Sequence, residues 1–477
     1  MLVLAGLWVA PGRVLAEQLG DSGPRTGSST DAAALTKSAP PAKPAPPLEP
    51  TAPVTPIAPV KRAPPVKRAL VVAVDGATRS VIERLSAEGD LPNLAALAEG
   101  GASGVLRSFM PLLSPRIWTT VATGMNPSDH GIEGWIHRGK DGEPSLYNSN
   151  DRKVPAVWNI LERAGHRVGV VNWLMTHPPE RIAGVMISDF AVPGTVGRRV
   201  QLGEAFAQAM FPDAAGDGDF HVGGGGFAYP PHWQGRFERL LGVRQPLTPF
   251  ENPFTDEETL AHPMGRFYNE IFVGDETVAR VALEIEETVD PDLLMVYLPG
   301  IDRLSHFLFA SLVPLADLPQ AFRLPAEARR QHSKQLLHHY RFVDAVIGKL
   351  VARYDDDDLV IVISDHGFEA PTREGQKFGI HETVAARDGV LYIKGPGIVA
   401  GSRAGEMSIA DVTPTLLCWF GLGAAVDMSG KCPEFLPFSR PATVASYSGT
   451  PIDRTGSDQP DVEQGVLDRL RTLGYVE

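Results

Sequence analysis

Apolar residues occur along the chain in two kinds of run. Short continuous runs rich in Val, Ile and Leu predict strands that are buried on both faces of a parallel sheet. They lie at 69–74, 168–171, 293–298, 359–363 and 390–393. Between them, apolar residues at helical spacing predict helices, among them 92–99 and 331–354. Strands that alternate with helices predict an α/β fold, with a doubly wound, mostly parallel sheet and helices on both faces.

Two stretches lack this alternation. Residues 17–66 are rich in Pro and Ala. Because proline removes backbone donors and favours extended conformations, this stretch predicts a disordered linker. The stretch at about 193–263 holds a glycine run, several prolines and no evident strand, and it predicts a cap-like insertion over a site. We therefore expect one folded domain over 67–477 that contains this insertion.

The chain begins with a short apolar stretch at 1–16 that ends in Val-Leu-Ala. Such a stretch is typical of a signal peptide with a small-residue cleavage site. It is too short for a transmembrane helix, which takes about 20 apolar residues, so no membrane span is expected in the mature chain. A periplasmic or secreted protein is predicted. A cytoplasmic protein is the alternative, because no basic segment precedes the apolar run.

Composition narrows the class of protein. Hydrophobic residues make up 43% and charged residues 21% of the 477 residues, as in soluble globular proteins. The formal net charge is −13 and no block of Lys and Arg is present, so binding to a nucleic-acid polymer is not expected. Cys418 and Cys432 are the only cysteines of the sequence, which is too few for a disulfide framework.

Two further features are interpreted as structural. Cys418 lies in an apolar helical run and is interpreted as a core residue. His338 and His339 lie inside the long predicted helix and are interpreted as surface or packing residues.

Acidic residues and histidines gather at the ends of the predicted strands. Ligands of open α/β sheets bind beyond the carboxyl ends of the strands, so side chains at these places are candidates for one shared site. They are Asp75 after the first run, Asp302 and His306 after the third, Asp365 and His366 after the fourth, and His381 just before the fifth. Each by itself has an ordinary interpretation as a turn former or helix-surface residue. Together they indicate a metal site, because zinc accepts carboxylate and imidazole ligands.

A serine occupies the start of another predicted helix. Ser114 followed by Pro115 forms a good N-cap and N1 pair, which needs no catalysis. The same helix start offers backbone N–H groups and a positive dipole end to a phosphate. A metal-bound serine there would be an activated nucleophile. The roles of cap and nucleophile are compatible, and both stay open.

In type and order these residues resemble the motifs of the alkaline phosphatase superfamily, specifically its type I phosphodiesterase/nucleotide pyrophosphatase family. The resemblance runs from about 68 to 423. It includes the turn Asp129-His130-Gly131, which is expected to position the helix of Ser114. It implies an alkaline-phosphatase-like fold and two divalent metal ions, with Zn²⁺ as the expected metal. One ion would be bound by Asp302, His306 and His381, and the other by Asp75, Asp365, His366 and the Ser114 oxygen.

The resemblance also implies a reaction. Ser114 would attack phosphorus and form a phosphoserine, which water would then hydrolyse at the two-metal site. The implied function is hydrolysis of small-molecule phosphoric esters of the phosphodiester or nucleotide pyrophosphate type. The alternatives are a phosphomonoesterase, a phosphotransferase or mutase of the same superfamily, and a non-catalytic envelope-binding protein.

Substrate binding is where the sequence departs from the family. Members usually carry Thr as the nucleophile and an Asn shortly after the His-Gly element, whereas this chain has Ser114 and, at the aligned place, Trp135. Arg116 could donate to the phosphate instead, as could Asn148, Asn150 or Arg152, and an arginine would favour doubly charged monoesters. The candidate substrate-binding residues are Arg116, Trp135 and Asn150. Equally, Arg116 could be an exposed residue of the first helical turn. A sulfatase is not expected, because the residues after Ser114 differ from the sulfatase signature.

Overall fold

The computed structural model describes residues 67–138, 144–189, 191, 226–261 and 263–455. All of these residues belong to one unit of the chain, which begins at Val66. The expected signal peptide, the expected linker and much of the expected insertion lie outside the described residues. Within the described part, no helix is both long enough and apolar enough to cross a membrane.

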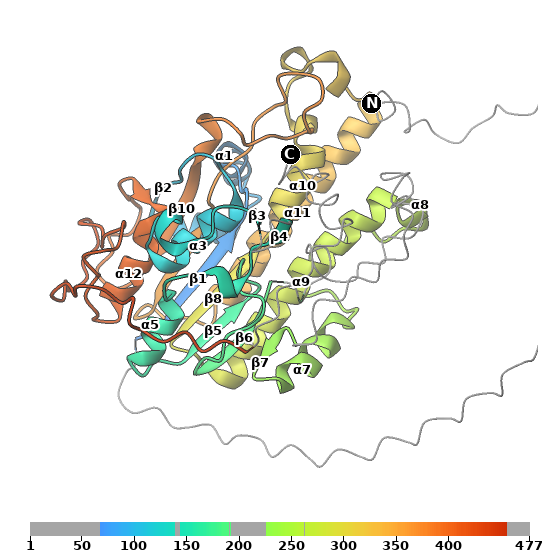
Figure 1. Cartoon of the computed structure of the whole chain (residues 1–477). Helices are drawn as coiled ribbons and strands as arrows, with labels where there is room; N and C mark the ends of the chain where they lie inside the picture. Colours follow the sequence, from blue (N-terminus) through green and yellow to red (C-terminus); the bar gives the residue numbers. More distant parts are fainter. Residues whose placement is uncertain (1–66, 139–143, 190, 192–225, 262, 456–477) are drawn as a thin grey trace, which may run out of the picture. The chain divides into compact units, whose positions relative to one another are not determined.

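A ten-stranded sheet lies at the centre of this unit (Figure 1). Its strands are β1 (Ala69–Val74), β2 (Ala102–Arg107), β5 (Val168–Val171), β6 (Gly184–Ile187), β7 (Ala228–Tyr229), β8 (Leu293–Leu298), β9 (Leu359–Ile363), β10 (Asp388–Lys394), β11 (Ser402–Arg403) and β12 (Met407–Ser408). Five neighbours run parallel in the order β9, β1, β8, β5, β6. The five predicted strands are β1, β5, β8, β9 and β10, so those predictions are confirmed.

The edges of the sheet are mixed. β10 pairs antiparallel with β9 and β2, and β11 and β12 pair parallel with β2. At the other edge β7 pairs antiparallel with β6. A separate two-stranded sheet consists of β3 (Ile136–Arg138) and β4 (Pro144–Leu146).

Helices cover both faces of the sheet. They are α1 (Arg79–Ala87), α2 (Pro92–Gly100), α3 (Ser114–Thr123), α4 (Pro127–His130), α5 (Val157–Arg163), α7 (His232–Leu241), α8 (Glu257–Ala261), α9 (Pro263–Val289), α10 (Gly300–Leu308), α11 (Ala326–Val351) and α12 (Val412–Trp419). β1, β5, β8 and β9 are buried along their whole length. Successive side chains of a strand point to opposite faces, so burial of all of them requires cover on both sides. Figure 1 shows α3, α5 and α12 on one side and α9, α10 and α11 on the other.

The register of three central strands determines where their following residues emerge. β1 lies between β8 and β9, with Val74 opposite Leu298 and Ala73 opposite Ile363. The segments that follow these strands therefore emerge side by side at one edge of the sheet. β10 runs in the opposite direction beside β9, so the segment that enters β10 reaches the same edge.

The stretch predicted as an insertion is only partly described. Its described residues include α7, α8 and β7, and β7 joins the central sheet beside β6. The sequence pattern of this stretch did not show that strand. β7 has only two residues, too short for an alternating or continuous apolar pattern to be recognised.

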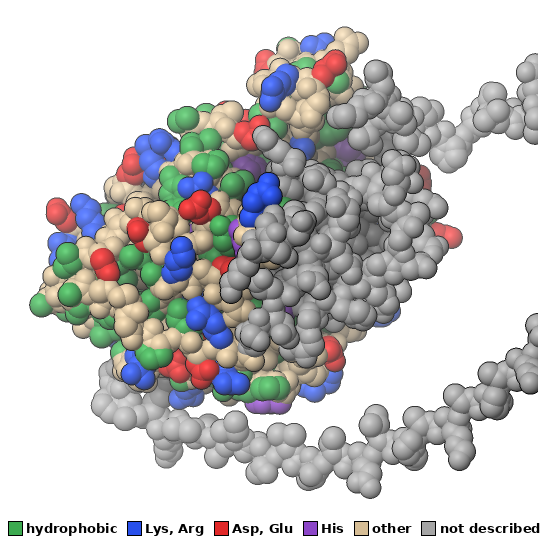
Figure 2. Space-filling model, viewed as in Figure 1, with side chains coloured by type: hydrophobic (Ala, Val, Ile, Leu, Met, Phe, Trp, Pro, Cys, Tyr) green, Lys and Arg blue, Asp and Glu red, His purple; other side chains and the backbone are tan. Residues whose placement is uncertain are grey.

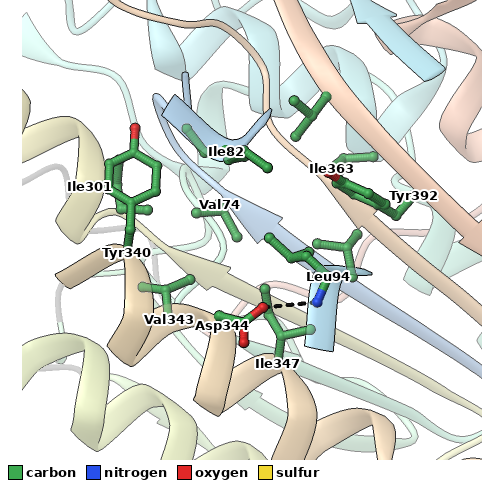
Figure 3. A pocket seen from close by; sticks show the side chains of 13 residues that line it. Val74, Ile82, Leu94, Ile301, Tyr340, Val343, Asp344, Ile347, Ile363 and Tyr392 are labelled. Carbon is green, nitrogen blue, oxygen red and sulfur yellow. Dashed lines mark hydrogen bonds between the residues drawn. The ribbon is translucent and has the colours of Figure 1, made fainter. Parts of the chain in front are cut away.

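A small apolar cavity lies in the core between β1, β9, α1, α2 and α11 (Figure 3). Its lining includes Val74, Ile82 and Val343, and one acidic residue, Asp344. The Asp344 carboxylate accepts the backbone N–H of Leu94 at 2.8 Å, at the start of α2. None of the predicted metal ligands lines this cavity, so it is a packing space of the core.

Candidate metal centre

Six predicted ligands form two buried clusters at this edge of the sheet. One contains Asp75, Asp365 and His366, and the other Asp302, His306 and His381. Within each cluster, one ligand atom from each residue lies within 4.8 Å of the others. All six residues are at most 8% exposed. The structure therefore groups these residues as the resemblance implies.

In the first cluster, two carboxylates face one imidazole nitrogen. His366 Nε2 lies 3.4 Å from Asp75 Oδ1 and 3.5 Å from Asp365 Oδ2. His366 Nδ1 lies 3.1 Å from the Gly367 carbonyl oxygen. A carbonyl only accepts, so Nδ1 carries the proton and Nε2 presents a lone pair to the carboxylates. Asp75 Oδ1, Asp365 Oδ2 and His366 Nε2 find no hydrogen-bond partner among the described residues, and a shared cation would satisfy all three.

The second cluster joins two imidazoles and a carboxylate. His306 Nδ1 lies 3.3 Å from the Gly379 carbonyl oxygen, so its Nε2 presents a lone pair. That Nε2 lies 3.3 Å from His381 Nε2 and 3.7 Å from Asp302 Oδ1. Burial holds the pKa of His306 and of His381 well below the usual value. Both rings are therefore neutral at pH 7, the form that binds a metal.

The two clusters adjoin each other. His366 Nε2 lies 3.9 Å from Asp302 Oδ1, and the rings of His366 and His381 stack at 4.2 Å between centroids. Burial, together with the charges of Asp75 and Asp302, holds the pKa of Asp365 well above its usual range. Three carboxylates thus lie close together in the interior. Divalent cations would stabilise this arrangement, so the residues present fit two such ions.

Two side chains that the sequence analysis did not identify orient Asp75. Tyr297 of β8 and Trp118 of α3 both donate to Asp75 Oδ2, Trp118 through its indole nitrogen at 3.2 Å. Oδ1 is left to face His366. Donors of this kind fix the direction of a ligating carboxylate. The next residue, Gly76, has φ of +66°, and a Cβ there would lie 2.9 Å from Asp302 Cα, so this tight turn requires glycine.

Ser114 is the first residue of α3, and Leu113 is the N-cap. The expectation that Ser114 caps the helix was wrong by one position, and no side chain caps this helix. Ser114 Oγ is buried and finds no hydrogen-bond partner among the described residues. Ser114 and Trp118 lie four residues apart and hence on the same face of α3. Because Trp118 donates to Asp75, the Ser114 hydroxyl lies on the side of α3 that faces the first cluster.

His130 attaches the turn after α3 to the helix itself. Its Nδ1 accepts the backbone N–H of Ile132 at 3.1 Å, so the proton is on Nε2, which lies 3.0 Å from Thr120 Oγ1. Burial lowers the pKa of His130 to about 3. A neutral His130 therefore holds the middle of α3, as expected for this turn.

The three expected substrate-binding residues lie in different surroundings. Arg116 is in the first turn of α3, half-buried, with its guanidinium 5.0 Å from the centre of the Phe109 ring. Trp135 is buried. Asn150 is in the 3₁₀ helix Ser149–Asp151, and its buried side-chain amide finds no partner among the described residues. Their roles in binding substrate stay predictions.

Lys377 is a cation near the second cluster that the sequence analysis did not identify. Burial lowers its pKa to about 7, whereas the charges of Asp302 and Glu382 act in the opposite direction. Its charge in turn lowers the pKa of His306 and of His381. Lys377 lies in a loop rather than at a strand end, so its position in the sequence gave no signal. A cation at this place suits a negatively charged substrate.

Solved structures match the chain at low identity. Phosphonoacetate hydrolase from Sinorhizobium meliloti is 17% identical, with a TM-score of 0.37 over 65% of this chain and 58% of its own. Human ectonucleotide pyrophosphatase/phosphodiesterase 5 is 12% identical, with a TM-score of 0.43 over 76% of this chain and 97% of its own. Phosphonate monoester hydrolase from Silicibacter pomeroyi is 16% identical, with a TM-score of 0.40 over 76% and 75%. The chain thus spans less than two thirds of the first of these proteins. Curated protein sequences give no match.

The chain also matches the sequence model of a protein family. Residues 69–415 match the sequence model of the family described as type I phosphodiesterase / nucleotide pyrophosphatase. This region covers more than half of the chain and includes Ser114 and all six residues of the two clusters. The chain therefore belongs to the type I phosphodiesterase / nucleotide pyrophosphatase family, a family of metal-dependent hydrolases of phosphoric esters.

Proposed function

We propose that the protein hydrolyses small-molecule phosphoric esters of the phosphodiester or nucleotide pyrophosphate type, with Ser114 as the nucleophile. One observation carries the proposal. The unpartnered hydroxyl of Ser114 lies on the face of α3 that contacts Asp75, and Asp75 belongs to one of two adjoining clusters of buried ligands. A buried serine beside such clusters has the surroundings that an activated nucleophile needs.

The proposed cofactors are two divalent cations, with Zn²⁺ as the expected metal. Asp75, Asp365, His366 and the Ser114 oxygen would hold one ion, and Asp302, His306 and His381 the other. When bound, such ions lower the pKa of a coordinated hydroxyl and neutralise charge on the attacking and leaving oxygens.

The proposed reaction has two steps. Ser114 Oγ attacks phosphorus, the ester oxygen leaves, and a phosphoserine forms at the start of α3. The positive dipole end of this helix start faces the phosphoryl oxygens, whereas the N–H groups of Leu113 and Arg116 already donate to backbone carbonyls. Because the Ser114 side chain makes no capping bond, the attack breaks no contact that holds the helix. Water then displaces Ser114 from phosphorus, so two inversions give net retention.

We further propose that residues 1–16 direct export to the periplasm or the medium and that 17–66 form a linker. The catalytic domain would then cover 67–477, with an insertion at about 193–263. Expression of the full chain, followed by sequencing of the N-terminus of the exported product, tests the first of these proposals. An intact Met1 in a protein retained in the cytoplasm would contradict it.

Hydrolysis of bis- and mono-p-nitrophenyl phosphate tests the reaction. We expect turnover that requires Zn²⁺, Mn²⁺ or Mg²⁺, stops with a chelator and is faster with the diester. No hydrolysis of either ester with any of the three metals would contradict the proposed function.

The nucleophile is tested by Ser114→Ala. We expect turnover to fall by about a thousandfold or more, because the covalent route is lost, while folding and metal content are retained. The matched control is Ser311→Ala, which removes another buried hydroxyl without a partner among the described residues. Near-normal rates in Ser114→Ala would leave Ser114 with a structural role only.

A further inference from the structure

The two cysteines lie side by side, although 13 residues separate them in the sequence. Cys418 is in the last turn of α12 and is buried, whereas Cys432 lies in the following loop and is partly exposed. Both are free thiols, and their side chains are in hydrogen-bonding contact. Neither belongs to the metal centre.

The loop after α12 brings Cys432 back to the helix. The backbone N–H of Lys431 donates to Asp411 Oδ1 at 2.8 Å, just before α12 begins. Further on, the Phe438 ring packs against Trp419, the last residue of α12, at 5.2 Å between centroids. The segment between these two contacts runs along α12, so the approach of the two thiols follows from the path of the backbone.

The surroundings of the two sulfur atoms differ. The hydrogen bond from Cys418 and the positive charge of Arg440 lower the pKa of the Cys432 thiol. Arg440 is held there by a bond from its guanidinium to the Pro433 carbonyl oxygen at 3.0 Å. The same hydrogen bond, together with burial, raises the pKa of Cys418. A partly exposed cysteine beside an arginine, with a lowered thiol pKa, is of the reactive kind.

We infer that Cys418 and Cys432 are a dithiol that forms an intramolecular disulfide with an oxidant of the disulfide class. The Cys432 thiolate attacks one sulfur of the oxidant and releases one thiolate, which leaves a mixed disulfide. The Cys418 sulfur, as its proton is lost, then attacks Cys432 and releases the second thiolate. The oxidant takes up two electrons and two protons and becomes two thiols. The protein dithiol loses two electrons and two protons and becomes the disulfide. An exported protein would meet such oxidants.

The crosslink would act on the loop that holds α3. The backbone N–H groups of Ser429 and Gly430 donate to the Gly124 carbonyl oxygen at 2.9 and 3.2 Å. Gly124 is the C-cap of α3, the helix that begins with Ser114. A disulfide would therefore tie α12 covalently to the segment that secures the far end of this helix.

Equilibration of the full-length protein in glutathione redox buffers tests the inference. After alkylation of free thiols, peptide mass spectrometry should find Cys418 joined to Cys432, two hydrogen atoms lighter than the dithiol. The ratio of dithiol protein to crosslinked protein should be proportional to the squared concentration of glutathione divided by the concentration of glutathione disulfide. This dependence is expected because an intramolecular disulfide exchanges with two glutathiones. In Cys432→Ser, the remaining Cys418 should stay unmodified in the folded protein.

Three outcomes would overturn the inference. They are mixed disulfides with glutathione that persist at equilibrium, disulfides between two chains, and two alkylated cysteines in excess glutathione disulfide. As a test of Arg440, the Arg440→Gln variant should form the crosslink several-fold more slowly at pH 7. The Arg403→Gln variant, at an exposed arginine elsewhere, should form it at the original rate. The experiment measures thiols alone, so its result does not depend on the proposed hydrolase reaction.

Discussion

The two oxygens of the Asp75 carboxylate have different neighbours. Oδ2 accepts from Tyr297 and Trp118, and Oδ1 faces the His366 ring. Turn formers and metal ligands are both found directly after strands, so the sequence left both interpretations of Asp75 open. Donors on one oxygen and an unpartnered second oxygen favour a ligand, because a turn former would bond its own backbone.

Arg116 is the residue whose substitution separates two classes of substrate. If its guanidinium binds phosphate, Arg116→Ala should lower kcat/KM for p-nitrophenyl phosphate about 10-fold more than for the diester, because a charge-assisted bond is lost. Arg116→Lys keeps the charge without the bidentate fork, so its kcat/KM for p-nitrophenyl phosphate should lie between that of the original protein and that of Arg116→Ala. An equal effect of Arg116→Ala on both esters would show that this arginine does not bind the phosphate.

His130 makes stability depend on pH. Its pKa is lowered to about 3 in the folded protein, against about 6.5 in an unfolded chain. The unfolded chain therefore takes up the proton first as pH falls. The contribution of neutral His130 to the free energy of unfolding is complete above about pH 6.5. It is lost progressively as the pH falls towards about 3. Free energies of urea unfolding between pH 7 and 4 should fall less steeply in His130→Gln than in the original protein.

The control for this measurement is His232→Gln, at an exposed histidine on α7. It should reproduce the pH dependence of the original protein. An unchanged slope in His130→Gln would mean that protonation of His130 does not oppose folding.

At the scale of elements, three helices meet at the start of α10, which carries Asp302 and His306. Asp275 Oδ2 of α9 accepts the backbone N–H of Gly300 at 3.1 Å and lies 3.0 Å from His339 Nε2 of α11. A Cβ on Gly300 would lie 2.2 Å from that oxygen, so glycine is required for this approach. His339, interpreted from sequence as a surface or packing residue, is fully buried and takes part in positioning a ligand helix.

Asp275 is therefore expected to act as a positioning residue for the second cluster. Asp275→Asn should destabilise the protein by about 1.5–3 kcal/mol, because a charged hydrogen bond is weakened. It should also weaken binding of the second metal ion by about 10-fold, since α10 is less firmly placed. Calorimetric metal titration measures the second effect separately from the first.

The matched control is Asp344→Asn, at a buried carboxylate that holds the start of α2 instead (Figure 3). It should lower stability in the same way and leave metal affinity unchanged. If both variants lose stability and neither loses metal affinity, Asp275 has a structural role only.

α10 also shows why some elements were not predicted from the sequence. The buried strands were found because each is a continuous apolar run, as in β1 and β8. In α10 the apolar residues Ile301, Leu304 and Leu308 recur at helical spacing, but the helix has only nine residues, too few for a sustained periodic pattern. Its polar residues Asp302, Arg303 and His306 are buried, which the sequence pattern alone does not show.

At the scale of the whole molecule, three buried carboxylates, those of Asp75, Asp302 and Asp365, adjoin one another at the candidate metal centre. The remaining surface shows no comparable grouping on the face in Figure 2, where the described Lys and Arg residues lie among Asp and Glu. The field at the site would be determined by the two clusters and by divalent ions bound to them.

Metal removal should lower the stability of the folded protein. Ions that bind the folded state alone stabilise it by about 2.7 kcal/mol per site at a hundredfold excess over Kd. The thermal midpoint should therefore fall with chelator and recover with Zn²⁺. Asp365→Asn removes one of the adjoining buried charges, so it should raise the midpoint with chelator and lower it with Zn²⁺. A midpoint that does not respond to chelator or Zn²⁺ in the original protein would contradict the two-metal site.

The sequence by itself determined which segments are buried strands and which chemical groups follow them, because continuous apolar runs and the residues after them are local properties. The family resemblance already implied how the ligands divide into two clusters, and the tertiary structure, with β1 between β8 and β9, brings the members of each cluster together. Only the tertiary structure decided that Tyr297 and Trp118 orient Asp75, that Asp275 holds α10 and that Cys432 meets Cys418. These contacts join residues distant in sequence, and their energies depend on strand order and helix packing, which no local pattern encodes.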